Sequence, residues 1–125
     1  MSGLYQVIHA PTGTTVAVVT RAESWWAKGW GVLGRRRLPV GEGLWLPGVA
    51  SIHTLGVRFS LDLLFLGRDF TCVKQVQKLP PGCWNACGAW AHHTLELGAG
   101  TLVERVPSAQ IGDRWLLERL PDITC

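Results

Sequence analysis

Apolar residues alternate strictly between Val57 and Phe65, a spacing of two that is typical of a β-strand. Leu64 and Leu66 are also apolar, so the far end of this strand is expected to lie deep in the fold. Gly67-Arg68-Asp69 then predicts a three-residue hairpin loop, with a return strand over 70–77. Shorter runs predict five further strands, over 4–8, 14–20, 44–46, 90–97 and 114–120.

Two segments carry helix signals. Thr20 and Glu23 form a capping-box pattern, and apolar residues then recur at steps of four, four and three as far as Leu33, which places them on one helical face. This pattern predicts one longer helix near residues 21–34. A second capping box opens a short helix near 101–106, which the proline that follows limits.

Predicted strands therefore outnumber helices, and most are joined by short turns. These features predict an α+β fold, mainly antiparallel β, with a curled sheet or partly closed barrel. The 125 residues correspond to a single domain, 1–125. A hydrophobic fraction of 47% with 17% charged residues excludes disordered, collagen-like and coiled-coil chains.

The net charge, the length of the apolar runs and the first ten residues limit the partners and the compartment that we expect for this protein. The formal net charge is +3, and the dense basic run Arg35-Arg36-Arg37 is shorter than the 5–8 residues typical of nucleic-acid tracts, so we do not expect nucleic-acid binding. Apolar runs fall short of the roughly 20 residues of a membrane span, and residues 1–10 lack signal-peptide features. We therefore expect a cytoplasmic protein whose four cysteines are reduced.

Several short motifs occur in a fixed order between residues 30 and 115. They are WGVLGR at 30–35, LP at 38–39, EGLWL at 42–46, SIHTLGVRFSLDLLFL at 51–66, LELGAG at 95–100 and IGD at 111–113. Together they resemble the domain of unknown function 192 family, which implies a β-rich single domain and supplies no reaction. Many members carry Trp-Met-Lys-Asn-Thr where this chain has residues 52–56, so a role tied to that Lys or Asn is not transferred.

Charged residues on the apolar strands are the candidate site. A charge held in a low-dielectric interior costs several kcal/mol unless it is paired, reaches water or is neutralised. Arg58 and Asp62 lie about 13 Å apart on a regular strand, so each needs a partner from elsewhere. The predicted cluster consists of Arg35, Glu42, His53, Arg58, Asp62 and Glu96.

This cluster has two interpretations. It is either a network of ion pairs that sets strand register, or a cleft in which Arg58 and His53 hold a small anionic or polar ligand and a carboxylate accepts hydrogen bonds. We predict a non-catalytic ligand-binding or accessory domain without a cofactor. The alternative is a small hydrolase or lyase that uses Asp62 or Glu96 as general acid/base. A further alternative is an interaction module that presents some of the seven Trp on its surface.

Cys83, Cys87, His92 and His93 are the residues with metal-binding chemistry. Zinc sites need ligand pairs with short, compatible spacing. The adjacent histidines lie on a predicted strand, where neighbouring side chains point to opposite faces. We therefore predict no metal site.

Overall fold

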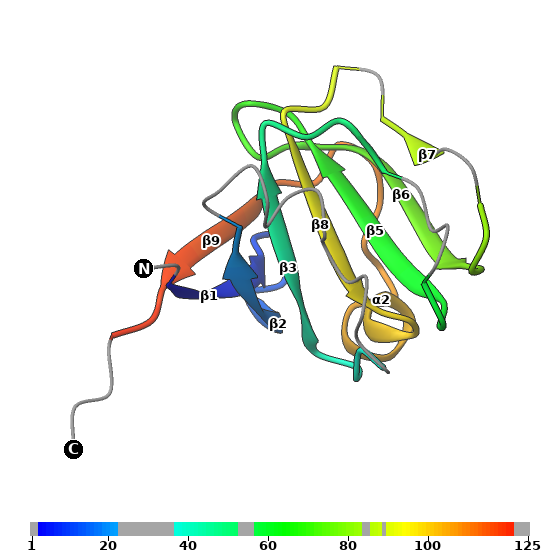
Figure 1. Ribbon diagram of the computed structural model, residues 1–125. Helices are drawn as coiled ribbons and strands as arrows, with labels where there is room; N and C mark the ends of the chain where they lie inside the picture. The colour runs from blue at the N-terminus through cyan, green and yellow to red at the C-terminus, as the bar shows by residue number, and fades with distance from the viewer. Residues whose placement is uncertain (1–2, 23–36, 53–56, 84–85, 89, 122–125) are drawn as a thin grey trace.

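The computed structural model describes residues 3–22, 37–52, 57–83, 86–88 and 90–121, which contain nine strands and one short helix. Seven strands form a curled sheet in the order β6-β5-β8-β3-β2-β1-β9, and β4 pairs with β7 (Figure 1). The elements are β1 (Leu4–His9), β2 (Thr14–Arg21), β3 (Glu42–Pro47), β4 (Ser51–Ile52), β5 (Leu61–Leu66), β6 (Cys72–Leu79), β7 (Ala86–Cys87), β8 (His93–Gly98), α2 (Thr101–Arg105) and β9 (Trp115–Arg119).

The strands β5 and β8 form the buried centre of the sheet. Every residue of both strands is buried, and two hydrophobic clusters cover the two faces of β5. Leu64 and Leu66 belong to the cluster inside the curl, whereas Leu61, Leu63 and Phe65 belong to the outer one. Each fully buried Leu or Phe contributes roughly 2 kcal/mol. Burial on both sides explains why this segment is apolar almost without interruption.

The sheet is mixed, not simply antiparallel. β1–β2, β1–β9, β3–β8, β5–β6 and β5–β8 are antiparallel pairs, as expected, but β2 and β3 are parallel from Val18↔Glu42 to Arg21↔Trp45. Parallel neighbours need a crossover connection, which here leads from residue 22 to residue 41. The longer helix predicted near 21–34 falls largely on residues 23–36, which lie outside the described residues, while Arg21 ends β2.

Several strand predictions are too long at their ends; the strand expected over 90–97, for example, begins only at His93. The strand expected over 57–66 begins only at Leu61, and the return strand begins at Cys72 instead of residue 70. Phe70 adopts a left-handed conformation with φ 64°, and the turn places it where hairpins usually carry glycine. A local alternation pattern does not reveal such a backbone conformation.

The short helix is confirmed, but its expected capping box is not formed. Gly100 occupies the N-cap with φ 91°, and no side chain of the cap residue bonds to the helix. The Thr101 hydroxyl instead donates to the Gly98 carbonyl at 2.6 Å. One of the first amides of the helix, that of Leu102, donates to the Asp62 side chain on β5 instead of to a cap residue.

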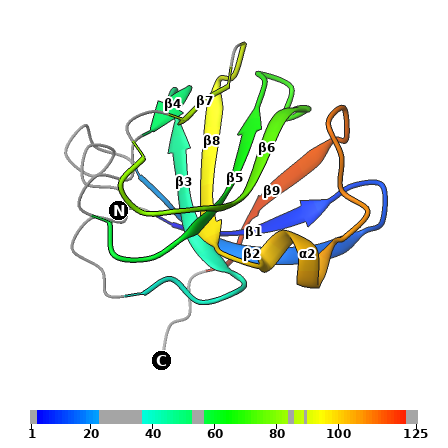
Figure 2. The same cartoon turned by 90° about the vertical axis from the view of Figure 1, so that its right-hand side faces the viewer.

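The two edge strands, β6 and β9, meet at one end of the sheet and diverge beyond it. Thr71 and Arg114 form a β-bridge, the Cys72 N–H donates to the Asp113 carbonyl at 2.8 Å, and the Trp115 N–H donates to the Phe70 carbonyl at 2.9 Å. The sheet is thus a half-barrel, closed at this end (Figure 2). Within the described part of the chain, no helix is long and apolar enough to cross a bilayer.

Candidate functional site

Asp62 lies on β5 and is completely buried, with 0% exposure. Its Oδ1 accepts the Lys78 N–H and its Oδ2 accepts the Leu102 N–H, both at 2.9 Å. The first contact satisfies an amide at the irregular end of β6, and the second satisfies one of the first amides of α2. These contacts make Asp62 a structural residue that joins three elements, and they leave neither oxygen positioned to receive a ligand.

Asp62 and Glu96 lie on opposite faces of the sheet. In the β5–β8 ladder Asp62 pairs with Leu97, whereas Glu96 pairs with Leu63. Residues directly opposite each other in an antiparallel ladder point to the same side, and successive residues alternate. Glu96, only 4% exposed, therefore faces the outer cluster, and the expected cleft containing both carboxylates is not formed.

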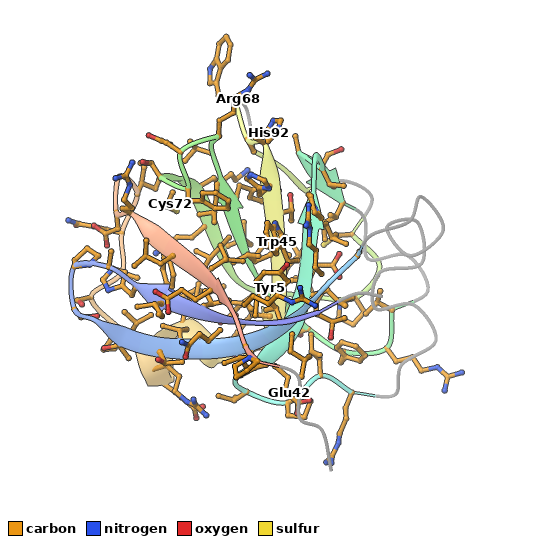
Figure 3. The ribbon with its side chains drawn as sticks, turned by 90° about the vertical axis from the view of Figure 1, so that its left-hand side faces the viewer. Tyr5, Glu42, Trp45, Arg68, Cys72 and His92 are labelled. Carbon is orange, nitrogen blue, oxygen red and sulfur yellow. The ribbon has the colours of Figure 1, made fainter. Side chains whose placement is uncertain are left out.

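The remaining members of the predicted cluster are scattered or undescribed. Arg58 is exposed in the irregular segment before β5, and Glu42 is exposed at the start of β3. Figure 3 places Glu42 at the end of the molecule opposite to Arg68 and His92. His53 and Arg35 lie outside the described residues. A site built from Arg35, Glu42, His53, Arg58 and Glu96 stays a prediction.

Four rings from four separate segments form an aromatic cluster inside the half-barrel: Tyr5, Trp45, Phe70 and His93. The Tyr5 and Trp45 rings meet edge to face at 4.9 Å, and Phe70 stacks on His93 at 4.5 Å with an angle of 11° between the planes. Figure 3 shows Tyr5 and Trp45 between β1 and β3. The Arg21 guanidinium lies 4.9 Å from the centre of the Trp45 ring, a cation–π contact.

His93 is held in one protonation state and one tautomer. The Trp45 indole N–H donates to His93 Nδ1 at 3.2 Å, so Nδ1 is the acceptor and the ring hydrogen resides on Nε2. The pKa of His93 is lowered to about 4, chiefly by burial and also by the neighbouring charges of His92 and Arg21. His93 is consequently neutral at pH 7.

The protein should lose stability between pH 7 and pH 4.5 because of His93. The unfolded chain takes up a proton on this residue near its ordinary pKa of 6.5, whereas the folded protein does so only near pH 4. We expect this linkage to remove about 2 kcal/mol of unfolding free energy across that range. Urea unfolding of His93→Gln, which keeps an acceptor for Trp45, should show a flatter pH profile. His92→Gln, at the exposed neighbour, should retain most of the wild-type slope because burial is the largest cause of the shift, and equal slopes for all three proteins would contradict the prediction.

A pocket of about 340 Å³ opens beside Phe70. It lies where the edge strand β9 diverges from β6, the edge strand on the other side of the half-barrel. Phe70 belongs both to its wall and to the aromatic cluster. Consecutive β9 residues line it, so the pocket follows the strand edge that has no neighbour in the sheet. The lining residues are Asp69, Phe70, Arg114, Trp115, Leu116, Leu117 and Glu118.

Two carboxylates and one guanidinium border this pocket. The hydrogen bond from the Thr71 N–H, at 3.1 Å, lowers the pKa of Asp69, and the charge of Arg114 acts in the same direction. Glu118 accepts a hydrogen bond from the Gln6 side-chain amide at 3.2 Å. The border of the pocket therefore carries two acceptor carboxylates and one donor guanidinium, and the wall that it surrounds is apolar.

Two further side chains with metal-binding or nucleophilic chemistry are His93, a predicted candidate, and Cys72, which was not one. His93 contacts Trp45 and Phe70, and no group of three metal-ligating side chains occurs among the residues that the structure describes. Cys72 is buried, and desolvation raises the pKa of its thiol to about 11, so it is a weak nucleophile at neutral pH.

Sequence reasoning did not find the aromatic cluster or the pocket. The rings come from residues 5, 45, 70 and 93, and no spacing rule connects them. The only available signal was the high Trp content. Trp45 and Trp115 are buried, Trp90 is 93% exposed, and Trp25, Trp26, Trp30 and Trp84 lie outside the described residues.

The fold defines a small β-rich half-barrel domain with a pocket beside its edge strand β9. Residues 7–114 match the model of the domain of unknown function 192 family, described as "Uncharacterized ACR". The chain belongs to this family. The family match begins well before residue 30, where the motif resemblance starts.

Two solved structures have the same fold. One is a candidate transcription regulator of Sinorhizobium meliloti 1021, with a TM-score of 0.78 and 22% identity over 94% of both chains. The other is a protein of unknown function from Novosphingobium aromaticivorans DSM 12444, with a TM-score of 0.70 and 19% identity over 92% of this chain and 84% of that one. No curated protein matches the chain. At these identities the similarity establishes the fold alone.

Proposed function

We propose that the protein is a non-catalytic small-ligand-binding domain whose site is the pocket beside Phe70. The observation that carries the proposal is the position of Phe70, an aromatic residue in a left-handed conformation between the pocket and neutral His93. A non-glycine residue in this backbone region costs on the order of 1–3 kcal/mol, and such residues concentrate at functional sites. The volume of about 340 Å³ lies within the range of small-molecule pockets.

The lining favours a polar ligand with a flat apolar portion and a basic nitrogen. Phe70 and Leu117 offer apolar and ring surface. Asp69 and Glu118 accept hydrogen bonds from a protonated nitrogen, while Arg114 neutralises only one of the two carboxylates. The expectation of an anionic ligand depended on Arg58 and His53; Arg58 does not line this pocket, and His53 lies outside the described residues.

The same charges support binding in preference to catalysis. A general acid or base near neutral pH needs a pKa close to the working pH. Asp69 has a lowered pKa, so it acts as a permanent acceptor and not as a proton donor. His93 is neutral and hydrogen-bonded to Trp45, so it contributes a fixed ring surface behind Phe70.

Phe70→Gly should weaken binding without unfolding the protein. Glycine adopts a positive φ without strain, so the turn is preserved while the ring is removed. Titrations with phenethylamine, and with phenylpropionate as its anionic counterpart, would be followed by NMR shifts of the backbone amides of 114–118. We expect phenethylamine to bind preferentially and the variant to lose at least about tenfold in affinity, which is about 1.4 kcal/mol.

Arg68→Ala, in the same turn but outside the pocket lining, is the matched control and should bind as the wild type does. Equal affinity of wild type and Phe70→Gly would refute the proposed site. Loss of binding in Arg58→Ala together with retention in Phe70→Gly would instead place the ligand at the cluster predicted from the sequence.

A further inference from the structure

Three side chains form a hydrogen-bonded chain at the tip of the β1–β2 hairpin, apart from the pocket lining. His9 Nε2 lies 2.7 Å from Asp113 Oδ2, and His9 Nδ1 lies 2.8 Å from Thr12 Oγ1. Asp113 comes from the turn before β9, 104 residues further along the chain. His9 is only 1% exposed and lies against the Trp115 ring at 4.9 Å, whereas Thr12 is exposed.

The direction of each hydrogen bond follows from the chemistry of the three groups. The ionised Asp113 carboxylate can only accept, so His9 Nε2 carries the hydrogen that is donated to it. In the tautomer that carries its hydrogen on Nε2 the lone pair is on Nδ1, and the Thr12 hydroxyl donates to that atom. The hydrogen bond from His9 lowers the pKa of Asp113, which keeps the carboxylate charged. The Gln110 N–H, at 2.9 Å, also holds Asp113 in place.

This order of carboxylate, imidazole and hydroxyl is the arrangement that activates a hydroxyl nucleophile. The carboxylate orients the imidazole and stabilises its protonated form, and the imidazole accepts the hydroxyl proton during attack. Here the two charged or basic groups are buried or half-buried, and the hydroxyl is at the surface, where a reactant can approach it.

Backbone hydrogen bonds hold most of the hairpin tip. The Gly13 and Thr12 N–H groups both donate to the His9 carbonyl, at 2.8 and 3.2 Å, and the Ala10 N–H donates to the Arg114 carbonyl at 3.0 Å. These bonds set the turn and attach it to the segment before β9. The Thr12 hydroxyl also lies 3.4 Å from the His9 carbonyl oxygen and accepts the Thr14 N–H at 3.4 Å, but its shortest contact, at 2.8 Å, is the one to His9 Nδ1.

We propose that Thr12 is a base-activated hydroxyl that accepts an acyl group from an ester or thioester. Thr12 Oγ1 forms a bond to the carbonyl carbon while His9 Nδ1 takes the hydroxyl proton. The tetrahedral intermediate then loses an alkoxide or thiolate, which receives the proton from His9. The products are acyl-Thr12 and a free alcohol or thiol, and His9 returns to its neutral form.

Acylation should be stoichiometric and not a rapid turnover reaction. Stabilisation of an acyl-transfer intermediate depends on amide donors aimed at the developing oxyanion. The Thr12 and Gly13 amides are directed to the His9 carbonyl instead. The site is therefore best described as a self-acylation site.

Incubation of the full chain with p-nitrophenyl acetate, and separately with S-acetyl-N-acetylcysteamine, followed by intact mass and peptide mapping, tests the proposal. We expect one fast acetyl adduct on Thr12, its loss in Thr12→Ala and its retention in Thr12→Ser. Thr15, exposed on the same hairpin, is the internal comparison, and Thr15→Ala should leave the adduct unchanged.

Asp113→Asn should slow the labelling of Thr12 at least tenfold, because the amide no longer orients and stabilises the imidazole as the carboxylate does. Thermal unfolding of each variant confirms that the fold is retained, and Thr12→Ala and Thr12→Ser change only an exposed position. Equal acetylation rates of Thr12 and Thr15, or adducts confined to lysines and the amino terminus, would overturn the proposal. So would an unchanged Thr12 rate in a folded Asp113→Asn protein.

Discussion

Replacing Asp62 with Ala is expected to lower the free energy of unfolding by about 3 kcal/mol. The substitution removes the acceptor of two backbone amides, those of Leu102 and Lys78. Leu102 is buried, so its N–H is left without a partner, which costs about 1–3 kcal/mol. Lys78 has φ 53°, and its strained backbone loses the contact that holds it. The cavity left by the side chain adds to the loss.

Urea unfolding measures this loss, with Asp69→Ala as the control. Asp69 also accepts a backbone amide, that of Thr71, but it is exposed, so water replaces the lost bond and the change should stay below about 1 kcal/mol. Asp62→Asn should fall between Asp62→Ala and the wild type, because one acceptor oxygen remains while its NH₂ group faces an N–H donor. A loss in Asp62→Ala no greater than that in Asp69→Ala would mean that Asp62 does not stabilise this junction.

Gly43→Ala is expected to be the second severe substitution, with a loss on the order of 3 kcal/mol. Gly43 lies on β3 opposite Leu97 of β8. A Cβ atom at this position would overlap the backbone carbonyl oxygen of Glu96 and lie 2.8 Å from Leu97 Cδ2. β3 is paired with β2 on one side and β8 on the other, so the strand has no direction in which to move away.

Gly67→Ala is the matched control for this effect. The nearest atom to its added Cβ is Asp69 Oδ1 at 3.4 Å, an ordinary contact at the end of an exposed side chain. We expect the free energy of unfolding of Gly67→Ala to lie within about 1 kcal/mol of the wild-type value. Equal urea midpoints for Gly43→Ala and Gly67→Ala would contradict the close approach of β3 to β8.

The predicted site was only partly recoverable from sequence because charge and periodicity do not specify partners. Asp62 was correctly expected to need a partner from elsewhere in the chain. Its partners are backbone amides of residues 78 and 102, and every residue except proline carries such an amide. The register between β5 and β8 then decides which carboxylates can meet, since it directs the Asp62 side chain to the inner face of the sheet and the Glu96 side chain to the outer face.

The amino-acid sequence by itself determined most strand positions, the β5–β6 hairpin, the short helix and the family. These features depend on neighbours within a few residues, where alternation, glycine and proline act directly on the backbone. Tertiary structure alone decided the parallel pairing of β2 with β3, the aromatic cluster around Trp45 and the His9–Asp113 pair. Those contacts join residues tens of positions apart, and they depend on which strands become neighbours in the sheet and on its curl.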